Sequence, residues 1–193
     1  MSAPSNVKRW RTSRTEFVRQ TRSVRYLTIV RHAKAAPATP GQSDFDRDLT
    51  KRGRDQCRQL REWAADRESL GRYGPTVALV SAAARTKETF RRAFQDTPFV
   101  TSREYSELIY NGRRDVSAED LLSELAALDP VTSSLLVIAH NPTVFELAAL
   151  LSTETPESLR YGRYPLGSAY VLALDERPVG RGRYELVASY VPT

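Results

Sequence analysis

Cysteine, histidine and long apolar runs are all scarce in this chain of 193 residues. The single cysteine, Cys57, cannot form a disulfide within the chain, which is typical of a reducing compartment or of a protein indifferent to redox conditions. Cys57 falls within a helical pattern, so we interpret it as a small core residue rather than a nucleophile. No apolar run approaches the roughly eighteen residues of a membrane-spanning helix. We therefore expect a cytoplasmic protein without a membrane partner.

The positive charge is confined to the N-terminus. The net charge is +6, and the excess of basic over acidic residues in 1–25 accounts for all of it. The sequence thus predicts a basic N-terminal extension over 1–25 and one folded domain over 26–193. The neutral remainder argues against a nucleic-acid partner, which would require a basic face on the fold itself. The extension resembles an organellar transit peptide or an arm that contacts an anionic partner; an extension without function is the alternative.

Both histidines of the chain follow apolar strand patterns directly. LTIVRHAKA, residues 27–35, places Arg31 and His32 after a run of β-branched and aliphatic residues, and LLVIAHNP, residues 135–142, does the same for His140. Continuous apolar runs of this length are typical of buried parallel strands. Ligands of open α/β sheets bind at the carboxyl ends of such strands. The two histidines are therefore candidates for one site.

Strand and helix patterns alternate along the rest of the chain. Besides the two histidine strands, the patterns predict helices over 50–68, 82–94, 117–128 and 143–151, strands over 76–80 and 98–102, and a hairpin of 168–174 with 183–191. Residues 34–49 and 106–116 have no periodicity and are expected to be loops. This alternation predicts an α/β fold with a mixed sheet.

Three strand ends should meet at one edge of that sheet. Right-handed crossovers between parallel strands would bring Arg31 and His32, the segment 81–85 with Arg85, and His140 together. Guanidinium groups bind phosphate oxygens in a bidentate manner, and a neutral imidazole can accept a phosphoryl group covalently. We interpret the cluster as a phosphoryl site. The alternative for each residue alone is a satisfied polar side chain at a strand end.

Four motifs in this order resemble the histidine phosphatase superfamily, and most of all its SixA-type phosphohistidine phosphatases. RHAKA resembles the RHG nucleophile motif, DRDLTKRGRDQC the start of the first family helix, SAAARTKET the SPxxRAxqT motif, and VIAHNP the second-histidine motif. The resemblance covers the chain from about residue 26 to its end. It implies a phosphoglycerate-mutase-like α/β fold, a three-layer sandwich with a mixed, mostly parallel central sheet flanked by helices.

The resemblance also implies roles for particular residues. His32 would be the phosphorylated nucleophile, with Arg31, Arg85 and His140 around the phosphoryl group. Glu107 stands where family members carry a candidate general acid, with a solvated loop carboxylate as the alternative. Arg47 would be an outer phosphate-binding residue or a surface residue. No cofactor is expected, and no metal, because two distant histidines without a close-spaced ligand set do not make a zinc site.

The expected activity is a metal-independent hydrolase, a phosphatase that forms a phosphohistidine intermediate on the enzyme. The short chain between Arg85 and His140 leaves little room for a lid, and an open pocket suits a phosphoryl group presented on a protein surface. The expected substrate is therefore protein phosphohistidine. A phosphatase for small phosphorylated molecules and a non-catalytic phosphate-binding module are the alternatives.

Overall fold

The computed structural model describes residues 25–66, 70, 74–112, 115–130, 133–153, 164–175 and 177–193. Its elements in chain order are β1 (Arg25–Arg31), η1 (Asp44–Asp46), α1 (Lys51–Ala65), β2 (Thr76–Ser81), α2 (Ala84–Ala93), β3 (Val100–Ser106), α3 (Ala118–Leu128), β4 (Ser134–Ala139), α4 (Thr143–Leu151), β5 (Ala169–Leu174) and β6 (Glu185–Tyr190). The basic extension expected over 1–25 lies outside the described residues, except that Arg25 is the first residue of β1. Arg25 therefore belongs to the fold and not to the extension.

The described strands form one mixed sheet in the order β3-β2-β4-β1-β5-β6. The pairs β1–β4, β2–β4 and β2–β3 are parallel, whereas β5 pairs antiparallel with both β1 and β6. This confirms the mostly parallel sheet and the C-terminal hairpin on its edge. Because β1, β2 and β4 run in the same direction, their carboxyl ends lie at the same edge of the sheet.

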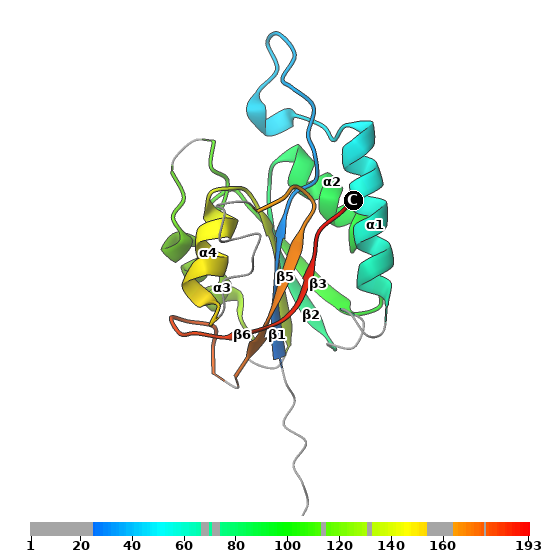
Figure 1. Cartoon of the computed structure of the whole chain (residues 1–193). Helices are drawn as coiled ribbons and strands as arrows, with labels where there is room; N and C mark the ends of the chain where they lie inside the picture. Colours follow the sequence, from blue (N-terminus) through cyan, green and yellow to red (C-terminus); the bar gives the residue numbers. More distant parts are fainter. Residues whose placement is uncertain are drawn as a thin grey trace, which may run out of the picture.

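Helices cover both faces of this sheet, which makes three layers (Figure 1). Successive residues of β1 point to opposite faces: Ile29 packs in the cluster that includes α3 and α4, and Val30 in the cluster that includes α1 and α2. This two-sided burial explains why the central strands read as continuous apolar runs. The fold is the α/β three-layer sandwich that the sequence predicts.

The third strand differs from its expected position at 98–102. β3 runs over Val100–Ser106, and the five residues from Thr101 to Tyr105 are exposed. β3 is an edge strand of the sheet. An edge strand with exposed side chains needs no apolar residues, and the sequence of β3 is accordingly polar. The hydrophobic pattern therefore could not predict the bounds of this strand.

The helix ends follow the expected capping. Thr50 caps α1, with its side chain accepting a hydrogen bond from the Gly53 amide. Ser117 and Asp120 form a capping box at the start of α3. The α1 cap is linked to the carboxyl end of β1, since the Thr50 amide donates to the Lys34 carbonyl at 2.9 Å. The start of α1 is thus held against the segment that follows β1.

Candidate active site

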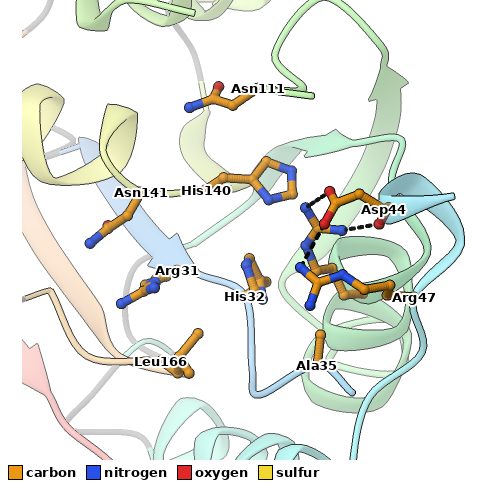
Figure 2. A pocket seen from close by; sticks show the side chains of 10 residues that line it. Arg31, His32, Ala35, Asp44, Arg47, Asn111, His140, Asn141 and Leu166 are labelled. Carbon is orange, nitrogen blue, oxygen red and sulfur yellow. Dashed lines mark hydrogen bonds and ion pairs between the residues drawn. The ribbon is translucent and has the colours of Figure 1, made fainter. Parts of the chain in front are cut away.

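A cavity of about 380 Å³ lies at the carboxyl ends of β1, β2 and β4. Its lining residues come from six separate segments and are Arg31, His32, Ala35, Asp44, Arg47, Arg85, Asn111, His140, Asn141 and Leu166. Figure 2 shows the two histidines at its centre, with Arg31 on one side and Arg47 on the other. The structure therefore brings together five of the six site residues expected from the sequence.

His32 follows β1 and is held by backbone groups on both sides. Its amide donates to the Ala139 carbonyl at 3.2 Å, and its ring Nδ1 lies 2.7 Å from the Ala33 carbonyl. A carbonyl only accepts, so Nδ1 carries the ring proton and Nε2 keeps a free lone pair. Burial, with the nearby charges of Arg85 and Arg31, lowers the pKa of His32 to about 3. The ring is therefore neutral near pH 7, as a nucleophile must be.

His140 follows β4 and faces His32. The two ring centroids are 5.1 Å apart, and Nε2 of His140 lies 2.8 Å from Ser81 Oγ. Its other ring nitrogen, Nδ1, is buried and has no hydrogen-bond partner among the described residues. Burial, His32 and Arg85 lower the pKa of His140 to about 2. His140 is therefore neutral near pH 7, and its Nδ1 is left without a hydrogen-bond partner among the described residues.

Three arginines surround the histidines from different elements. Arg31 ends β1 and donates to the Tyr164 carbonyl at 2.6 Å, Arg85 lies in the first turn of α2, and Arg47 follows η1. The Nε groups of all three arginines are buried and lack a partner among the described residues. Unpaired buried donors are costly, and an anion in the pocket would reduce that cost. This set of donors is suited to a phosphoryl group.

Asp44 was not among the expected site residues. Its carboxylate accepts from Arg85 at 2.9 Å and pairs with Arg47 at 2.7 Å (Figure 2). It also accepts from the Tyr110 hydroxyl at 2.8 Å. Burial would raise the pKa of Asp44, but Tyr110 and the two arginines outweigh that effect and lower it. An ionised carboxylate therefore lies among the phosphate-binding groups.

Asn111 and Asn141 were also missed by the sequence reasoning. Asn111 exchanges hydrogen bonds with Thr143 at the start of α4, with its amide nitrogen 2.7 Å from the Thr143 hydroxyl. Asn141 directly follows His140, and its side-chain oxygen is buried without a partner among the described residues. Proximity to the second histidine could have indicated Asn141. Nothing in the loop sequence indicated Asn111 or Asp44.

Glu107 does not line the cavity. It follows β3, its side chain is exposed, and its backbone carbonyl accepts from the Tyr110 amide at 3.2 Å. Glu107 lies on the same loop as Tyr110. Tyr110 contacts the pocket, because its hydroxyl donates to Asp44. A role for Glu107 as general acid would require it to move toward the pocket.

Three other features of the described residues bear on what the sequence predicts. No group of three or more histidine, cysteine or carboxylate residues among them is positioned to hold a metal ion. None of the described helices is long and apolar enough to cross a membrane. Cys57 is fully buried on α1, and burial raises the pKa of its thiol to about 12, which agrees with a core residue.

Solved structures with this fold identify the class of the protein. A structure assigned as the phosphohistidine phosphatase SixA from Agrobacterium tumefaciens is 30% identical, with a TM-score of 0.68 over 87% of this chain and 99% of that chain. A SixA structure from Nakamurella multipartitia is 24% identical, with a TM-score of 0.66 over 88% and 96% of the two chains. A protein histidine phosphatase SixA complexed with tungstate is 24% identical, with a TM-score of 0.64 over 85% and 95%.

No protein-family model and no curated protein sequence matches the chain. The chain nevertheless belongs to the histidine phosphatase superfamily, in its SixA-type branch. It is a phosphatase enzyme.

Proposed function

We propose that the enzyme removes phosphoryl groups from phosphohistidine on proteins, without a metal ion and through a phosphohistidine formed on His32. The observation that carries this proposal is the neutral His32 ring, whose Nδ1 is bound to the Ala33 carbonyl while three arginines surround it. In the first step Nε2 attacks phosphorus, the P–N bond of the substrate breaks, and the substrate imidazole leaves. Arg31, Arg47 and Arg85 would bind the phosphoryl oxygens.

His140 would stabilise the same charge through its free ring nitrogen. Because the Ser81 hydroxyl can donate to Nε2, Nδ1 of His140 can carry the ring proton and donate it to a phosphoryl oxygen. In the second step water attacks phosphorus and the bond to His32 Nε2 breaks. Inorganic phosphate leaves, the ring recovers its lone pair, and the proton of the water passes to solvent.

The choice of phosphohistidine depends on the acid–base properties of the pocket. Asp44 is the carboxylate among the described lining residues, and its lowered pKa keeps it ionised. An ionised carboxylate cannot donate the proton that an alkoxide leaving group needs. A phosphohistidine ring can be protonated before its P–N bond breaks, so it leaves without that help. The pocket thus favours a phosphoramidate over an alkyl phosphate.

Access to the pocket supports a substrate on a protein surface. The Asp44 side chain is 51% exposed and that of Arg47 is 25% exposed, so the side of the cavity formed by η1 is open to solvent. A phosphoryl group carried on a macromolecule can enter from that side. SixA of Agrobacterium tumefaciens is assigned as a phosphohistidine phosphatase, and the likeness to it supports the same substrate class here.

The test compares the wild type with His32→Ala in the presence of a chelator, on a histidine-phosphorylated protein and on p-nitrophenyl phosphate. We expect faster turnover of the phosphoprotein, an acid-labile phosphoenzyme in the wild type, and loss of both in His32→Ala. Glu107→Gln should leave turnover of the phosphoprotein unchanged. Preferential turnover of the aryl ester, or good turnover of an alkyl phosphate that depends on Glu107, would favour a small-molecule phosphatase. Retention of most of the rate in His32→Ala would overturn the mechanism.

A further inference from the structure

A second cavity is lined entirely by arginine among the described residues. It has a volume of about 370 Å³ and lies between α1 and α2, and we call it the arginine groove; its lining residues are Arg54, Arg58, Arg61, Arg91 and Arg92. The phosphatase site uses none of these side chains. All five residues are exposed.

The helical repeat explains how the arginines meet. Arg54, Arg58 and Arg61 follow one another on one stripe of α1, because residues three and four positions apart lie on the same helix face. Arg91 and Arg92 lie in the last turn of α2, which packs beside α1. The groove is therefore formed by two helices of the same layer, on the side away from the sheet.

Three of the five groove arginines, Arg58, Arg61 and Arg91, have weak partners or none among the described residues. Arg58 pairs with Glu62 at 3.3 Å and Arg61 with Asp96 at 3.8 Å, and these side chains are more than half exposed. Exposed pairs of this kind contribute about 0–1 kcal/mol each. The side chain of Arg91 makes no hydrogen bond or ion pair with a described residue. Guanidinium groups with such weak internal partners are available to an anionic ligand.

The groove begins next to the segment that forms the rim of the pocket. Arg54 donates to the Leu49 carbonyl at 2.7 Å, and the Leu49 amide donates at 3.1 Å to Glu88, which also pairs with Arg92. Leu49 follows Arg47 by two positions in the chain. At about 1.5 Å of rise per residue, Arg91 lies roughly 9 Å along α2 from Arg85. A protein whose phosphohistidine occupies the pocket could therefore cover the groove as well.

We propose that the arginine groove binds an acidic segment of the phosphohistidine-bearing protein and so aligns that protein with the pocket. This inference rests on the proposed function. The groove is bordered by carboxylates that include Asp55, Glu62 and Asp96. Nucleic acids and anionic membranes carry continuous negative charge, which would lie against these carboxylates as well, whereas a protein segment can place its carboxylates opposite the arginines alone. Carboxylates of the partner are thus the ligands that fit the groove.

The experiment uses two short helical peptides, each with one phosphohistidine, that differ only in having glutamate or glutamine along one helix face. Free phosphohistidine serves as a third substrate. We expect the wild type to show a KM about tenfold lower for the glutamate peptide at low salt, with kcat unchanged. This preference should disappear in 1 M salt and in the Arg58→Glu/Arg91→Glu variant. Turnover of free phosphohistidine should be the same in wild type and variant.

Arg181→Glu is the matched control, because Arg181 is an exposed arginine that also pairs with a glutamate, on the other side of the molecule. It should keep the preference for the glutamate peptide. Equal KM values for the two peptides in the wild type, or an unchanged preference in the double variant, would refute the proposal. Stronger inhibition by a DNA oligonucleotide than by the dephosphorylated glutamate peptide, relieved in the double variant, would assign the groove to nucleic acid instead. Absence of turnover of both phosphopeptides and of free phosphohistidine in the wild type would refute the proposed function and not the groove.

Discussion

The two histidines differ from ordinary histidines in remaining neutral far below their usual range. Burial is the main cause and lowers the pKa of His32 to about 3 and that of His140 to about 2, from 6.5. In the unfolded chain both rings take up a proton near pH 6.5. Below that pH the unfolded state binds more protons than the folded state, so the free energy of unfolding falls as pH falls. Burial of the two histidines therefore carries a stability cost in mild acid.

This cost can be measured because the chain has only these two histidines. Between pH 7 and pH 5.5, above the ordinary range of carboxylates, we expect the free energy of unfolding to fall by at most about 1.4 kcal/mol per pH unit for each histidine. Urea denaturation at a series of pH values gives this slope. The His32→Asn/His140→Asn variant should show a much smaller slope over the same range. Equal slopes would mean that the rings are protonated in the folded enzyme.

If the arginines bind the phosphoryl group as proposed, Asp44 competes with the substrate for Arg47 and Arg85. In the free enzyme its backbone carbonyl and its carboxylate accept from both terminal nitrogens of Arg85, and the carboxylate also pairs with Arg47. An incoming phosphoryl group must displace this carboxylate and is repelled by its charge. In Asp44→Asn we therefore expect the inhibition constant of inorganic phosphate to fall about three- to tenfold, a modest change because the side chain is half exposed.

Asp46→Asn is the control for this prediction. Asp46 lies in the same short helix, η1, and is exposed, but it does not line the cavity. It should leave the inhibition constant unchanged. Weaker phosphate binding in Asp44→Asn would instead show that the carboxylate orients the arginines and that competition is the smaller effect.

At the scale of elements, a glycine of α1, Gly53, lets this helix pack closely against the backbone of Lys34, in the segment that follows β1. A Cβ atom at Gly53 would lie 2.2 Å from the Lys34 carbonyl oxygen, which accepts from the Thr50 amide. Helix propensity alone predicts that Gly53→Ala stabilises α1 by about 1 kcal/mol. The steric conflict with backbone atoms predicts the opposite sign, a loss of about 1–3 kcal/mol. Chemical denaturation decides between the two.

The same substitution should affect catalysis, because Lys34 lies two positions after His32. We expect a lower kcat in Gly53→Ala and no change in Arg52→Ala, which alters an exposed neighbour on the same helix. Stabilisation in Gly53→Ala with normal kcat would show that α1 can move away from the segment without consequence.

Elements were predictable from the sequence where local physics determines them. The Thr50 cap, the capping box of Ser117 with Asp120, and the apolar stripe of α1 all depend on residues within a few positions of one another. His32 and His140 were predictable because strand order and direction bring parallel carboxyl ends together. The exposed edge strand β3 was misplaced because it lacks an apolar pattern.

The contacts of Asp44 could not be predicted. Asp44 lies in an aperiodic loop, and its partner Arg85 is 41 positions away. Their meeting depends on how that loop folds over the sheet edge, which no local pattern encodes. Likewise, the position of Glu107 outside the cavity depends on the path of the loop after β3. The two histidines, Arg31 and Arg85 thus follow strand ends, where the sequence encodes them, whereas Asp44 and Arg47 come from the loop over the sheet edge.

At the scale of the whole molecule, one buried ion pair joins three parts of the chain at the end opposite the active site. Arg25 begins β1, and Asp129 follows α3; their side chains are 4% and 0% exposed. Arg25 also donates to the Arg177 carbonyl at 2.7 Å, and Asp129 accepts from the Val179 amide at 2.7 Å. The first strand, the third helix and the connection between β5 and β6 therefore depend on the same two charges.

Removing one partner should be costly because the other stays buried and uncompensated. We expect Asp129→Ala to lower the free energy of unfolding by about 3–5 kcal/mol, measured by urea denaturation. Arg181→Ala, which breaks an exposed pair with Glu119, should change it by less than about 1 kcal/mol. If both variants were equally stable, Arg25 would have to reach water when Asp129 is absent. Because β1 carries Arg31 and His32 at its other end, kcat of folded Asp129→Ala should stay normal, which separates the stability of the first strand from the chemistry at its tip.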